Sequence, residues 1–372
     1  MPNKGIDFQM KDRLHWIFRL LVEAMSVVLL AGCTHLPAAS MVDLPLPQFQ
    51  PAPLFDEQIR SQQLADGVRI FFNAPKMIDR SRPTRLIIYA LPNGSNIEET
   101  LGATLVAGLS ARHDIQHIAA QTRVLRKVND EENIVLVLVE ADGKAWPAWR
   151  AKRPDNARLI AEIFDGIQKE IATLLPTPLR VSLMAHSGGG SFIWGLMNHA
   201  ALPASIDRIA LLDANYSFDS ALQHGSKFLH WLQQSSDRRL IVIAYDDREI
   251  LYEGKRVIGP TGGTWRASGR MLDDFGRHLT LAKVPDDNFD ITTAMPRVSN
   301  SASQNESQIV FYLHRNPQNK ILHTRLVGEM NGFLMAATLA TTAERTWGNF
   351  GEPRAYSAYV QATPFVFSPG AP

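Results

Sequence analysis

One serine of this chain lies in a setting that favours nucleophilic chemistry. Ser187 follows an apolar run at residues 181–184 and precedes three glycines, Gly188, Gly189 and Gly190, and then an apolar helical stretch. We therefore expect it on a tight turn between a buried strand and a helix. Such a turn projects the hydroxyl, and its neighbours must be small because bulky ones would collide with adjacent strands. The N–H of Gly188 would then face a developing oxyanion at the start of the helix.

The segment from Ala185 to Gly189 resembles the nucleophile elbow of the α/β-hydrolase family, whose pattern is Gly-x-Ser-x-Gly, with Ala185 in place of the first glycine. The glycines do not fit the G-x-G-x-x-G phosphate-binding pattern, and no G-K-[ST] sequence follows them. The resemblance implies an α/β fold with a mainly parallel central sheet and helices on both faces. It also implies a serine nucleophile and no cofactor.

The resemblance further implies where the oxyanion donors and the acid should lie. A second oxyanion donor should come from the loop after the strand two before the elbow, where Asn93 is our candidate. The acid should follow a later strand. The apolar run 240–245 ends in Asp246 and Asp247, of which Asp247 is our first choice. Asp246 and Asp213, which ends the preceding strand, are the alternatives.

The base expected from this resemblance is a histidine ahead of a C-terminal helix. His323 satisfies this, with a helix expected through 335–339, and His314 is the alternative. The order Ser187, Asp247, His323 matches the order of the family. His323 would accept the proton of Ser187, and Asp247 would orient the imidazole. Ser187 would then attack the carbonyl of a small-molecule or envelope-derived acyl substrate, and water would hydrolyse the acyl-enzyme.

Two tryptophans are candidates for substrate contacts. Trp146 and Trp149 follow the strand predicted at 134–139. Loops at the carboxyl ends of a parallel sheet line its crevice, so we expect both side chains to border the substrate pocket. Packing in the core is the alternative interpretation of these two residues.

Apolar strands alternate with amphipathic helices through the rest of the body. Strands are expected at 68–72 (an edge strand), 85–90, 134–139, 179–184, 208–212, 240–245, 279–284 and 309–313, and helices up to about 126, at 156–174, from 188, at 220–234 and at 265–277. This steady alternation favours a mainly parallel sheet with helices on both faces. The long segment 248–320 is expected as an insertion that forms a lid or a substrate wall.

The single cysteine of the chain, Cys33, ends an apolar stretch and the sequence Leu-Ala-Gly-Cys, which resembles the lipobox of bacterial lipoproteins. This resemblance implies a signal peptide at 1–32, a lipidated and proline-rich tether at 33–57, and a folded domain at 58–372. The protein would be held on the membrane of the cell envelope by a lipid anchor on Cys33. Thr34 stands where an Asp often signals inner-membrane retention, so an outer-membrane location is expected.

Composition excludes some functions. The 372 residues carry 38 Lys+Arg against 37 Asp+Glu, and this balance gives no broad field for nucleic acid. One cysteine excludes an intramolecular disulfide and multi-cysteine zinc modules. His113 and His117 have the i, i+4 spacing of zinc hydrolases, although Asp114 stands where those enzymes carry Glu. A zinc hydrolase and a non-catalytic binding module are therefore the alternatives to a serine hydrolase.

Overall fold

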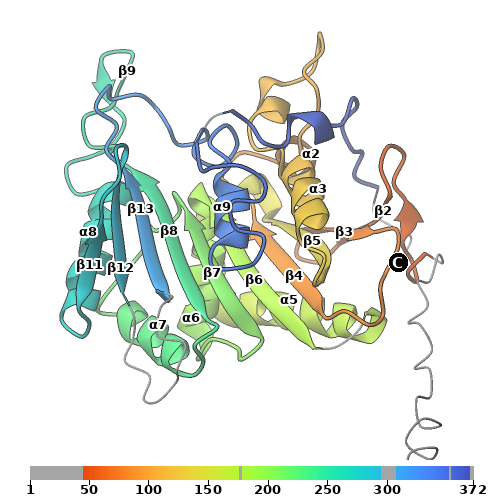
Figure 1. The fold of residues 1–372 in the computed structure, drawn as a ribbon, viewed down its shortest axis with the longest axis horizontal. Helices are drawn as coiled ribbons and strands as arrows, with labels where there is room; N and C mark the ends of the chain where they lie inside the picture. The colour runs from red at the N-terminus through yellow and green to blue at the C-terminus, as the bar shows by residue number, and fades with distance from the viewer. Residues whose placement is uncertain (1–44, 176–177, 295–306, 352, 369–372) are drawn as a thin grey trace, which may run out of the picture. The chain divides into compact units, whose positions relative to one another are not determined.

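The computed structural model describes residues 45–175, 178–294, 307–351 and 353–368. The chain divides into two compact units, Met1–Met41 and Val42–Pro372, and all described residues belong to the second. That unit is built on an eleven-stranded sheet of order β1-β2-β3-β5-β4-β6-β7-β8-β13-β12-β11, with a separate hairpin of β9 and β10 (Figure 1).

The strands are β1 (Gln50–Pro51), β2 (Glu57–Gln63), β3 (Arg69–Pro75), β4 (Thr84–Ala90), β5 (Asn133–Glu140), β6 (Leu179–His186), β7 (Ile206–Leu212), β8 (Arg239–Tyr245), β9 (Leu251–Tyr252), β10 (Lys255–Arg256), β11 (Leu281–Val284), β12 (Phe289–Ala294) and β13 (Ile309–His314). The six central strands, from β5 to β13 in the sheet order, pair in parallel. They are continuous apolar runs because helices cover both of their faces. The mainly parallel sheet predicted from the sequence is confirmed.

Both edges of this sheet are antiparallel. On one side β3 pairs with β5, and β2 and β1 follow outside it. The run predicted as an edge strand is therefore an interior strand. On the other side β12 and β11 extend the sheet beyond β13. The segment expected as an insertion at 248–320 thus contributes β11, β12 and β13 to the sheet, and its residues 295–306 lie outside the described residues.

The helices are α2 (Ile97–Leu101), α3 (Ile118–Val128), α4 (Trp146–Ala151), α5 (Asn156–Leu174), α6 (Gly190–His199), α7 (His224–Gln233), α8 (Thr264–Gly276) and α9 (Gly332–Thr338). Their buried side chains form two apolar clusters, one on each face of the sheet. Helices α4 to α8 contribute to the first cluster, and α2, α3 and α9 to the second. Figure 1 shows α3 and α9 in front of the sheet and α5 and α6 behind it.

The compact unit includes part of the segment expected to be a tether. Leu46 and Phe49 are buried and join the first apolar cluster, and the ring of Phe49 lies 6.1 Å from that of Phe72 on β3. Packing into the domain therefore begins upstream of residue 58, because these two apolar side chains cover the end of the sheet. Cys33 and the signal sequence predicted around it lie outside the described residues.

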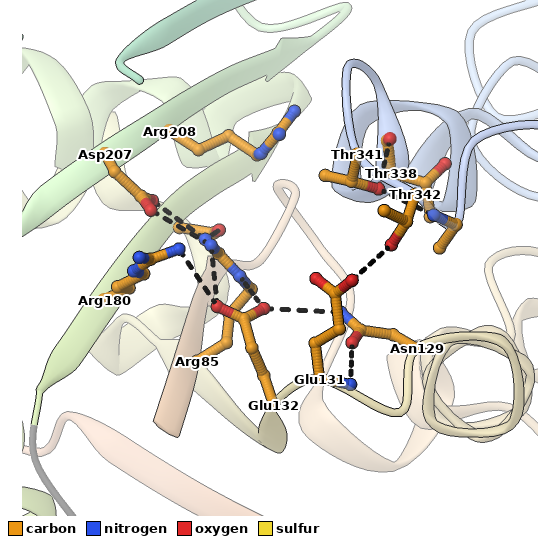
Figure 2. A network of polar contacts seen from close by, with 12 residues as sticks. Arg85, Asn129, Glu131, Glu132, Arg180, Asp207, Arg208, Thr338, Thr341 and Thr342 are labelled. Carbon is orange, nitrogen blue, oxygen red and sulfur yellow. Dashed lines mark hydrogen bonds and ion pairs between the residues drawn. The ribbon is translucent and has the colours of Figure 1, made fainter. Parts of the chain in front are cut away.

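A buried arginine ties together the amino ends of the central strands. Arg85 on β4 donates to Asp207 Oδ1 at 2.8 Å and Oδ2 at 3.0 Å and to Glu132 Oε2 at 2.6 Å, and it lies between the two carboxylates in Figure 2. It also donates to Ser182 Oγ on β6 at 2.9 Å. One guanidinium thus joins three parallel strands, β4, β6 and β7, and the residue before β5, at the opposite end of the strands from Ser187.

We expect an Arg85→Met variant to be strongly destabilised, because it removes the buried guanidinium that pairs with both carboxylates and leaves Glu132 with only the longer ion pair to Arg180. The free energy of unfolding in urea should fall by about 3–5 kcal/mol. Arg158→Met is the control, since Arg158 pairs with Asp155 and Glu162 on an exposed helix face. Its loss should change the free energy of unfolding little, because solvent screens exposed ion pairs. Equal stabilities of the two variants would contradict this role of Arg85.

Candidate active site

Ser187 lies on the turn that the sequence predicts. It follows the last residue of β6 directly and opens a short 3-10 turn (Ser187–Gly189) that leads into α6. Its φ of 54° is in the left-handed region, which non-glycine residues seldom adopt. A serine held in this conformation between a strand and a helix is the arrangement that projects a nucleophilic hydroxyl.

The glycines after Ser187 allow other segments to approach the turn closely. A Cβ atom on Gly188 would overlap the side chain of Asn93, and one on Gly189 would overlap the carbonyl oxygen of Ala90. The two residues predicted as oxyanion donors, Gly188 and Asn93, therefore lie against each other. The N–H of Gly94, the next residue in the Asn93 loop, donates to Lys144 O at 2.8 Å. That hydrogen bond fixes the loop and uses the N–H of Gly94, so Asn93 stays the candidate oxyanion donor of this loop.

His323 contacts a carboxylate, and that carboxylate belongs to Asp213. The distance from His323 Nδ1 to Asp213 Oδ2 is 2.5 Å, with Asp213 buried and the imidazole 26% exposed. The prediction of His323 as the histidine with an acidic partner agrees with this geometry, but the choice of Asp247 as that partner is wrong. Asp213 follows β7, the strand paired with β6, and lies one strand from Ser187. Asp247 follows β8, one strand further away.

Asp247 instead helps to hold the start of α8. Its Oδ2 accepts a hydrogen bond from the N–H of Thr264 at 2.8 Å, and the Thr264 hydroxyl donates to Asp213. Burial raises the pKa of Asp247, and the neighbouring Asp213 carboxylate adds to the effect. Asp246, the other alternative, forms an ion pair with Arg248 at 2.6 Å. Thr264 therefore connects Asp213, the acid that contacts His323, with Asp247, the acid that the sequence analysis chose for this role.

Two residues that the sequence analysis did not select also contact this group. The ring of His186 packs 4.6 Å from that of His323, and its Nε2–H donates to the backbone oxygen of His323 at 3.0 Å. Burial lowers the pKa of His186 well below its usual range, so the ring is neutral. Tyr216 follows Asp213 in the loop after β7, and its phenol lies close enough to Ser187 for the two groups to interact. His186 was visible as the variable residue before Ser187 in the motif, whereas Tyr216 gave no signal in the sequence.

No hydrogen bond joins Ser187 to His323 in the described part of the chain. In unliganded enzymes such bonds are commonly long and shorten when substrate binds. His186 provides the structural link, because it precedes Ser187 in the chain and holds the His323 backbone. His314, the alternative base, accepts a hydrogen bond at Nδ1 from the N–H of Asn316 and does not contact Asp213.

The prediction that Trp146 and Trp149 bind substrate is wrong. Each side chain is 1% exposed, and the two rings pack edge to face at 5.4 Å. The Trp146 indole N–H donates to Val139 O, and its ring packs on Phe192 of α6. Both residues anchor α4 to the core, because burying these large apolar rings stabilises the fold more than exposing them at the sheet edge would.

The histidine pair considered for zinc does not share a helix. His113 lies in a 3-10 turn (Ala111–Asp114), and His117 has a left-handed φ of 50° just before α3. His113 Nδ1 bonds Ser110 O at 3.2 Å and His117 Nε2 bonds Asp114 at 2.8 Å. Within the described ranges no group of three or more His, Cys, Asp or Glu side chains is arranged to hold a metal ion.

No described helix is long and apolar enough to cross a membrane.

No family model matches the chain, and no curated protein matches it in sequence. Among solved structures it is similar to a cold-adapted esterase from an Arctic intertidal metagenomic library (12% identity, TM-score 0.33, 64% of this chain and 83% of that chain). It is also similar to a feruloyl esterase module from Clostridium thermocellum (11%, 0.36, 56% and 76%) and to an uncharacterised protein from Capnocytophaga ochracea (12%, 0.41, 76% and 63%). The described chain has the predicted α/β architecture: a mainly parallel sheet, helices on both faces, and a tight turn after β6 that carries Ser187.

Proposed function

We propose that this chain is a serine hydrolase that cleaves an ester or related acyl bond, with Ser187 as nucleophile, His323 as general base and Asp213 as the acid that orients it. One observation carries the proposal. A bonded imidazole–carboxylate pair, His323 and Asp213, lies at the same edge of the sheet as a serine held in a left-handed conformation on a strand-to-helix turn. This set of roles is the one that acyl transfer needs.

The proposed first step transfers the Ser187 proton to His323 as the serine oxygen attacks the acyl carbonyl. Asp213 accepts the Nδ1–H of His323, which keeps Nε2 free to accept the serine proton and stabilises the imidazolium. The leaving group then takes that proton from Nε2. In the second step water repeats the attack on the acyl-enzyme, His323 accepts its proton, and Ser187 is restored.

Two features support stabilisation of the oxyanion that forms in each step. The N–H of Gly188 lies at the start of the turn that opens α6, and the loop of Asn93 packs directly on it. Backbone donors in this position act on charge that develops only in the transition state. Tyr216, which interacts with Ser187, lies in the loop that carries Asp213.

The proposal is tested with p-nitrophenyl butyrate, an ester with a small acyl chain and a good leaving group. The purified protein should release p-nitrophenol above the buffer rate. After acid quenching during turnover, digestion should give a butyrylated peptide that contains Ser187. A folded protein that releases no p-nitrophenol from the acetate, butyrate or octanoate ester would contradict the proposal.

A further inference from the structure

A cavity of about 310 Å³ lies beside α6, apart from the residues proposed for catalysis. Its walls come from α4, from α6 and from the loop between β7 and α7. The lining side chains include Arg150, Trp194, Asn198, Phe218, Leu222 and His224. Ser187, Asp213 and His323 do not line it. The cavity is therefore separate from the proposed catalytic group.

Arg150 is the unusual group in this wall, because it is half-buried and forms no ion pair with a carboxylate among the described residues. Its Nε donates to Asn156 Oδ1 at 2.9 Å, and its Nη1 donates to the backbone and side-chain oxygens of Ser191 at 3.1 Å. Its Nη2 has no partner in the described part of the chain. A guanidinium stays charged, so the cavity contains a fixed cation with a donor to spare.

Of the other polar groups of the wall, His224 and Asn198 leave a donor available, whereas Ser217 and Asp219 lie on the exposed rim. His224 Nε2 is bonded to Asn198 Oδ1 at 2.9 Å, and its Nδ1 accepts from the N–H of Asp219 at 3.1 Å. Burial, together with Lys227, lowers the pKa of His224 to about 4, so the ring is neutral at pH 7. This leaves the amide NH₂ of Asn198 as a donor. The carboxylate of Asp219, on the exposed rim, accepts the N–H of Ala221 at 2.8 Å.

Aromatic rings form the apolar part of the wall. The indole of Trp194 stacks on His224 with centroids 4.8 Å apart and packs edge to face with Phe218 at 6.3 Å. The indole N–H of Trp194 is buried and has no acceptor among the described residues. The cavity thus combines flat apolar surface with a guanidinium that has no ion pair among the described residues and with the free donors of Arg150 and Asn198.

We propose that this cavity binds a small organic carboxylate, with the carboxylate on Arg150 Nη2 and the apolar body of the ligand against Trp194 and Phe218. A carboxylate supplies acceptor oxygens for Arg150 Nη2, which no described residue contacts through a hydrogen bond, and its planar shape matches a guanidinium. The site lies outside the proposed catalytic group, so this inference goes beyond the proposed function and its test measures binding rather than turnover.

Benzoate is the probe, and benzyl alcohol is the uncharged compound of the same shape. Saturation-transfer NMR and calorimetry on the full chain at millimolar ligand should show that benzoate binds and benzyl alcohol binds much more weakly. Arg150→Gln should weaken benzoate binding roughly ten- to a hundredfold, because a charge-assisted hydrogen bond is lost. Arg153→Gln is the control, since Arg153 lies on the same segment, contacts Trp149 and does not line the cavity.

A second pair of variants tests the site without altering Arg150 or the fold. Leu222 is 47% exposed at the cavity, so polar substitutions there should leave the protein folded. Leu222→Glu should weaken benzoate binding by placing a negative charge at the site, whereas Leu222→Gln should bind like the parent. Absence of benzoate binding by the folded parent would overturn the proposal. So would equal affinity in the parent, Arg150→Gln and Leu222→Glu proteins.

Discussion

A Ser187→Ala variant is expected to lose roughly 10⁴–10⁶-fold in kcat for p-nitrophenyl butyrate, because it removes the atom that forms the acyl-enzyme. The small remaining rate would come from oxyanion stabilisation and substrate binding. The fold should be unaffected, since the side chain is small and its left-handed backbone conformation is open to alanine at a modest cost. Steady-state rates and the urea midpoint, measured on the same preparation, separate the two effects.

The matched control for this variant is Ser217→Ala. Ser217 is an exposed serine next to Tyr216, at the same edge of the sheet, and it has no role in the proposed mechanism. Its variant should hydrolyse the ester at close to the parental rate. If Ser187→Ala kept the parental rate, or if both variants lost activity equally, Ser187 would not be the nucleophile.

The two candidate acids are expected to differ sharply when each is replaced by its amide. Asp213→Asn should lower kcat/KM by about 10⁴-fold, because an amide stabilises the wrong imidazole tautomer and cannot balance an imidazolium. Asp247→Asn should change kcat/KM little. Its amide oxygen can still accept the N–H of Thr264, and burial already disfavours a charge at this position.

Ester hydrolysis by the two variants, compared with the parent over the same pH range, measures this difference. The isosteric change keeps both side chains the same size, so a folding defect is not expected to mask the result. If Asp247→Asn were the inactive variant and Asp213→Asn the active one, the contact between His323 and Asp213 would not be the catalytic one.

The elbow and much of the central sheet could be predicted because their signals are local. A buried apolar run, a serine among small residues and an apolar helix are contiguous in sequence, and the amphipathic period of α5 marked its bounds at Asn156–Leu174. Strands β1 and β2 gave no such signal. β2 (Glu57–Gln63) is largely polar, and its buried Glu57 is tolerated only because Arg123 and Arg126 of α3, distant in sequence, pair with it.

The choice of acid could not be predicted, because it depends on which strands become neighbours. Asp213 and Asp247 both follow apolar strands whose carboxyl ends meet at one edge, so the local patterns are equivalent. The pairing of β7 with β6 and the position of α8 decide which carboxylate reaches His323. The two tryptophans were misassigned for the same reason. Their place after β5 was predicted correctly, but they lie on helix α4, and their burial is set by contacts with α6.

The central claim, an activated serine at position 187, is tested most directly by intact mass spectrometry after treatment with a fluorophosphonate. The parent protein should gain a single adduct, and digestion should place it on Ser187. The Ser187→Ala protein should gain none, and Asp213→Asn should react far more slowly than Asp247→Asn. A folded parent protein that gains no adduct, or an adduct that persists in Ser187→Ala, would contradict the account.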